Sequence, residues 1–67
     1  MYVGFISKND GSALDFKGVE TLLPSPIYQR ENNVHVYRWY WRLINYKDQT
    51  TRLVSIDEYK LAFVSEE

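Results

Sequence analysis

The sequence predicts a small, mainly β domain whose five strands form a small barrel or a strongly curved antiparallel sheet. Three observations lead to this prediction. Short β-prone runs alternate with turn residues along the whole chain. Aromatic residues make up 16% of the 67 residues, which suits a small core without disulfides, because Cys is absent. The densest run, residues 34–46, holds both tryptophans and three of the six tyrosines.

The N-terminal third contains two expected strands. Residues 2–7 are apolar and β-prone, and an Asn-Asp-Gly turn signal at 9–11 ends them. Residues 19–23 alternate in a way that indicates a second strand. A helix beginning at Ser12 is disfavoured, because Gly18 and the β-branched residues after it are poor helix formers.

A proline-containing stretch precedes the densest run. Pro24 and Pro26 interrupt regular structure, so we expect a surface loop of about ten residues that continues to Asn33. The Asn-Asn pair at 32–33 is a turn signal. The strand at 34–46 would begin directly after it.

The chain after this strand predicts a hairpin and a single turn. Residues 47–50 are polar and connect the dense strand to a partner strand at 51–56. Ser55 followed by Glu58 fits a capping box, which predicts one 3₁₀ or helical turn near residues 56–60.

The rest of the chain adds one strand and a tail. Residues 61–64 are β-prone, and 65–67 are expected to be a frayed acidic end. Residues 1–67 therefore form one expected domain. No run approaches the length of a membrane span, and no secretion signal is expected at the N-terminus.

This order of elements resembles the SH3-like barrel. Residues 13–18 look like the L-x-F-x-x-G stretch of that family, and 39–41 hold aromatics where its central hairpin opens. Residues 53–61 look like its closing strand, its 3₁₀ turn with Tyr and its last strand. The resemblance implies a five-stranded barrel, with an OB-like barrel or an open curved sheet as alternatives.

Two departures bear on the function that this resemblance implies. The peptide-binding members open with A-L-Y-D-Y, whereas Gly4 and Ile6 stand here where groove tyrosines would be expected. The Pro of the closing strand is missing, and Ser55 lies nearby instead. The resemblance thus supports a barrel and argues against recognition of proline-rich peptides.

Charge limits the class of partner. The formal net charge is −1, which disfavours a duplex DNA binder that neutralises phosphates. The distribution is uneven, since residues 30–52 carry a local charge of +3 and residues 53–67 a local −3. The absence of Cys excludes thiolate metal sites and agrees with an expected cytoplasmic location.

The residues needed for catalysis are not grouped in this sequence. His35 is the single histidine, and no arrangement of nucleophile, base and orienting residue accompanies it. The carboxylates show no metal-ligand spacing, and the three glycines form no phosphate-binding loop. We therefore expect no enzyme, no metal and no cofactor.

The dense strand has two faces of different chemistry. Alternation places aromatic side chains on one face and arginines beside Tyr40 on the other, unless a bulge near 39–41 exchanges them. The expected core aromatics are Tyr37, Trp39, Trp41, Phe16 and Phe63. The expected partner-binding residues are Arg38, Tyr40, Arg42, Tyr46 and His35. Surface arginines can also simply lie over the sheet and pair with carboxylates such as Glu58.

Two functions fit these observations. The first is a protein-interaction module, a small regulator, inhibitor or accessory subunit of the kind that phages and mobile elements encode, which docks on a larger protein. Self-association through a strand edge is a variant of it. The second is binding of single-stranded nucleic acid or RNA by a stacking sheet, for which the near-neutral net charge is less suitable.

Overall fold

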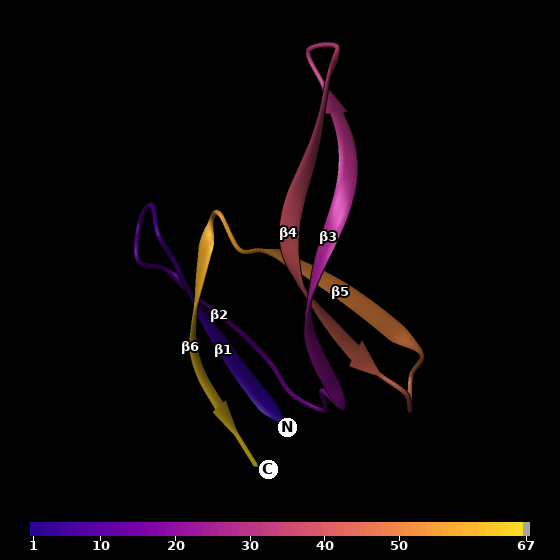
Figure 1. Cartoon of the computed structure of the whole chain (residues 1–67). Helices are drawn as coiled ribbons and strands as arrows, with labels where there is room; N and C mark the ends of the chain where they lie inside the picture. The colour runs from indigo at the N-terminus through magenta and orange to yellow at the C-terminus, as the bar shows by residue number, and fades with distance from the viewer. Residues whose placement is uncertain (67) are drawn as a thin grey trace.

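In a computed structural model, the chain forms two three-stranded antiparallel sheets (Figure 1). The structure describes residues 1–66. The first sheet has the order β2-β1-β6 and the second the order β3-β4-β5. The strands are β1 (Tyr2–Ser7), β2 (Ala13–Phe16), β3 (Thr21–Glu31), β4 (Val34–Asn45), β5 (Thr50–Ser55) and β6 (Tyr59–Ser65).

The fold is mainly β as predicted, but the expected five-stranded barrel is wrong. Within residues 1–66 there are six strands, and no hydrogen-bonded ladder joins one sheet to the other. The chain changes direction between β2 and β3 at Gly18, whose φ of 71° is in the left-handed region. The Val19 N–H then donates a hydrogen bond to the Met1 carbonyl at 3.0 Å. β2 and β3 are therefore two separate strands that belong to different sheets.

The prolines lie inside β3 instead of opening a loop, which corrects the prediction. Pro24 is opposite Trp41 and Pro26 is opposite Trp39. Proline has no N–H, so these must be the non-hydrogen-bonded pairs of the ladder, with both ring nitrogens facing the outer edge of β3. β3 is an edge strand of its sheet, where this arrangement leaves no ladder bond unmade.

A two-residue turn holds β3 and β4 in register. Asn32 has a φ of 49° and Asn33 a φ of 64°, the positive pair that a type I′ turn requires. This turn matches the twist of the flanking strands, and the register from Glu31 opposite Val34 to Thr21 opposite Ile44 contains no shift. The considered bulge near 39–41 is therefore absent; a shift occurs instead between Gly4 and Phe5, where β1 pairs with β6.

The predicted 3₁₀ turn is also wrong, although part of its capping box forms. The Glu58 N–H donates to Ser55 Oγ at 3.3 Å. Residues 56–58 make only a simple turn, because pairing of β6 with β1 already begins at Tyr59 and leaves no room for a helical element. β6 extends to Ser65, so the first residue of the predicted frayed tail belongs to a strand. Glu67, the last residue of that predicted tail, lies outside the described residues.

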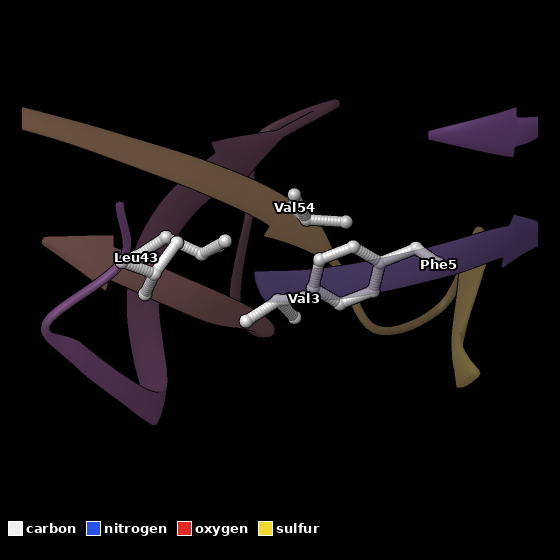
Figure 2. Packing of buried hydrophobic residues seen from close by; sticks show 5 residues of the cluster. Val3, Phe5, Leu43 and Val54 are labelled. Carbon is white, nitrogen blue, oxygen red and sulfur yellow. The ribbon is translucent and has the colours of Figure 1, made fainter. Parts of the chain in front are cut away.

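A small core joins the two sheets. Its five buried hydrophobic residues are Val3, Phe5, Val19, Leu43 and Val54. Figure 2 shows Val3 and Phe5 of β1 pointing toward Leu43 and Val54 of the second sheet. Phe16 and Trp41 pack against this cluster and are half-buried.

The other three expected core aromatics are not in the core. Tyr37 and Trp39 are 68% and 49% exposed, because the first sheet covers only the part of β4 that contains Leu43. Phe63 is also exposed. It lies on the outer face of the first sheet, where its ring meets Tyr2 edge-on at 5.1 Å and covers Gly4.

Gly4→Ala tests this packing. A Cβ at position 4 would lie 2.1 Å from Cε1 of Phe63, so the ring must move. We expect a loss of about 1–3 kcal/mol in the free energy of unfolding, as in other over-packed sites. Urea denaturation measures it.

Phe63→Ala provides the matched background. Removing the ring removes the clash, so Gly4→Ala should cost much less in the Phe63→Ala chain than in the original chain. Equal costs in the two backgrounds would show that Phe63 does not lie over Gly4.

Candidate functional site

The outer half of the β3–β4 hairpin extends beyond the rest of the molecule (Figure 1). β5 pairs with β4 only from Tyr40 to Asn45, so the backbone of residues 34–38 is paired with β3 alone. The Cα radius of gyration is 13.1 Å, compared with about 11 Å for a compact chain of this length. The molecule is therefore extended, with the outer hairpin as its projecting part.

One face of this hairpin is a continuous aromatic surface. We call it the aromatic face, and it consists of Pro26, Tyr28, His35, Tyr37 and Trp39. Tyr28 stacks on His35 with ring centroids 5.3 Å apart and meets Tyr37 edge-on at 5.5 Å. Tyr28 and Tyr37 form a non-hydrogen-bonded pair of the ladder, the kind of pair in which cross-strand side chains lie closest together.

The aromatic face is exposed and carries little charge. Tyr28 is 53% exposed, and Tyr37 and Trp39 are also exposed. By register, Arg30 lies beside His35, and no carboxylate of β3 or β4 shares this face. Such a surface offers apolar area, ring faces and one guanidinium to a partner.

The opposite face of the hairpin is occupied by internal polar contacts. Arg38 pairs with Glu31 at 2.7 Å and lies 3.7 Å from Asp57. The hydrogen bond from Arg38 to Glu31 and the charge of Glu31 raise the pKa of the guanidinium above its ordinary value. Tyr40 is half-buried, and its hydroxyl accepts a hydrogen bond from Gln29 at 2.9 Å.

Arg42 lies farther along this opposite face. Its cross-strand neighbours are Leu23 and Leu53, both exposed. Its Nε is buried without a hydrogen-bond partner, and no carboxylate in residues 1–66 forms an ion pair with it. Tyr46 lies beyond the end of β4, where its hydroxyl is 2.9 Å from that of Thr21.

The structure thus divides the predicted partner-binding residues among three places. Arg38, Tyr40 and Arg42 share a face, as their alternation predicts. His35 lies on the aromatic face, and Tyr46 is near the base of the second sheet. Of the aromatic face, only His35 is among the predicted partner-binding residues. Tyr37 and Trp39 are predicted as core aromatics, and the sequence predicts no role for Pro26 and Tyr28. The spacing of the two prolines is the signal for these last two residues, since it places both ring nitrogens on one strand edge.

A groove of about 580 Å³ separates the edges of β2 and β5. Its wall includes Leu14, Phe16, Leu53 and Tyr59. Arg52 lies there with its guanidinium carbon 5.6 Å from the centre of the Phe16 ring. The groove is mainly a gap at the margin of the shared core, because Leu14, Phe16 and Tyr59 all pack against that core.

Residues 1–66 contain no group of three or more His, Asp or Glu side chains placed to hold a metal ion. In the same part of the chain, no helix has the length and apolar character needed to cross a membrane.

Comparison of the chain with protein-family models, with curated proteins and with solved structures finds no match in any of the three.

Fluorescence quenching tests the different environments of the two tryptophans. The Trp41→Phe variant reports Trp39, and the Trp39→Phe variant reports Trp41. We expect acrylamide to quench Trp39 more strongly, because Trp39 is 49% exposed whereas Trp41 packs against the core. Equal quenching of the two single-tryptophan chains would contradict this placement of Trp39.

Proposed function

We propose that this chain is a non-enzymatic protein-interaction module that docks on a larger protein through the aromatic face of the β3–β4 hairpin. It would act in the cytoplasm as a small regulator, inhibitor or accessory subunit. The observation that carries the proposal is the exposure of Tyr28, Tyr37 and Trp39 on one uncovered face.

The composition of this face is that of an interface core. Trp and Tyr are enriched among the residues that dominate binding energy, because each buries a large apolar area and keeps a polar group for a hydrogen bond. Charged residues are depleted at such centres. The aromatic face combines these properties, and the ion pair of Arg38 with Glu31 lies on the other side of the hairpin.

The surface area of the whole chain supports the same proposal. Its solvent-accessible surface is 4951 Å². A monomeric protein of 8.0 kDa is expected to expose about 4,450 Å². The excess of about 500 Å² approaches what one partner contributes to a small interface.

Binding of single-stranded nucleic acid is the less favoured alternative. Its stacking requirement is met by the aromatic face, but it also needs several free cations along the backbone path. Arg38 is paired with Glu31, and the Arg30 guanidinium donates to Asn33 Oδ1 at 3.1 Å. Few cations remain beside the exposed rings.

Paired double variants test which face docks. The aromatic variant, with Tyr37→Ala and Trp39→Ala, removes two large side chains from the aromatic face. The control variant, with Arg38→Ala and Tyr40→Ala, removes two large side chains from the opposite face. Immobilised chains would be incubated with lysate of the source cells, with and without nuclease treatment. We expect one bound protein to be shared by the original chain and the control and to be lost from the aromatic variant.

The outcomes separate the alternatives. Circular dichroism should show both variants folded, since the substituted aromatics are exposed or only half-buried. Retention of the same protein by the aromatic variant would refute docking through this face. Binding that disappears on nuclease treatment would favour the nucleic-acid alternative.

A further inference from the structure

The two edges of the β3–β4 hairpin differ in their capacity to accept another strand. Pro24 and Pro26 occupy the outward-facing positions of β3, so that edge lacks two of its N–H groups. β4 contains no proline. Its open edge, on the side where β5 pairs farther along, therefore has all of its backbone donors.

The register identifies which groups of β4 face this open edge. Even-numbered residues of β4 bond to β3, because the odd-numbered Trp39 and Trp41 are opposite prolines. The N–H and C=O groups of His35 and Tyr37 therefore point away from β3. The Ile56 N–H donates to the Trp39 carbonyl at 3.0 Å, which marks where the open edge ends.

We propose that a second copy of this chain pairs with this edge, residues 34–38 of the two copies forming an antiparallel ladder about a twofold axis at Val36. In this register each His35 exchanges both backbone hydrogen bonds with Tyr37 of the other copy. The open segment is thus complementary to itself, and its ends coincide with the Asn-Asn turn and with the Ile56 contact. β3 of each copy forms an outer, proline-protected edge.

The side chains of the pair are compatible with this arrangement. Val36 meets its own copy on one face, and His35 lies beside Tyr37 of the other copy on the aromatic face. Neither cross-strand contact opposes like charges. The two aromatic faces become one surface that contains both copies of Tyr28, Tyr37 and Trp39.

The proposed interface is small, because each copy contributes a ladder of only five residues. Small interfaces of this kind form weak and transient complexes. The dimer should therefore be reversible and should form only at high protein concentration. This inference rests on the proposed function in one respect, because it assumes that the joined aromatic faces remain free for the larger partner.

His35→Pro tests the pairing directly. It removes an outward N–H while leaving the β3 ladder intact, as Pro24 and Pro26 already do on the other strand. His35→Ala is the matched control, since it shortens the side chain and keeps the N–H. Sedimentation velocity over a range of concentrations should show a dimer for the original chain and for His35→Ala, and association weakened about tenfold or more in His35→Pro.

If His35→Pro fails to fold, amide hydrogen exchange in the unmodified chain tests the same strand pairing. The amides of His35 and Tyr37 should become protected as concentration rises, whereas that of Val36, already bonded to β3, should change less. An original chain that stays monomeric, or a folded His35→Pro chain that dimerises as well as His35→Ala, overturns the proposal. Either result leaves the capture experiment with the aromatic double variant unaffected, so the two proposals fail separately.

Discussion

The contact between the two sheets, where Val3 and Phe5 of β1 meet Leu43 and Val54, determines how the rest of the chain is arranged (Figure 2). No ladder in residues 1–66 joins the sheets, so this apolar contact, together with the hydrogen bond from the Val19 N–H to the Met1 carbonyl, holds them together. The contact is small, with five buried hydrophobic residues. Because β4 is longer than the first sheet can cover, its outer half and that of β3 extend into solvent. The candidate site is therefore a consequence of a core that ends near Trp41.

The hairpin keeps its shape through features that lie within it. The Asn32-Asn33 turn sets the register, and the non-hydrogen-bonded pairs bring Tyr28 against Tyr37. On the other side, Arg38 joins Glu31 to Asp57 of the β5–β6 turn. These exposed ion pairs contribute little stability, because water and salt screen them. They also engage charged side chains of one face, whereas the other face is aromatic and nearly uncharged.

The sequence predicted the strand content well and the burial poorly. Alternation placed Arg38, Tyr40 and Arg42 on one face and Tyr37, Trp39 and Trp41 on the other, as the register confirms. It could not show which aromatics are buried, because that depends on how far β1 and β6 cover β4. Local propensity disfavours proline in strands and so predicts a loop at Pro24 and Pro26, yet an edge strand accepts proline where the missing N–H faces outward. The role of Tyr28 was hidden for the same reason.

Native-state hydrogen exchange at low protein concentration tests whether the outer hairpin is ordered but lies outside the shared core. We expect the Leu43 amide to exchange only through global unfolding. The amides of Val36 and Arg38, which bond to β3, should exchange through local opening at a clearly lower free energy. Addition of a partner that covers the aromatic face should slow these two amides and leave Leu43 unchanged. If Val36 and Arg38 exchange as slowly as Leu43 in the free chain, the hairpin is part of the core and the account is wrong.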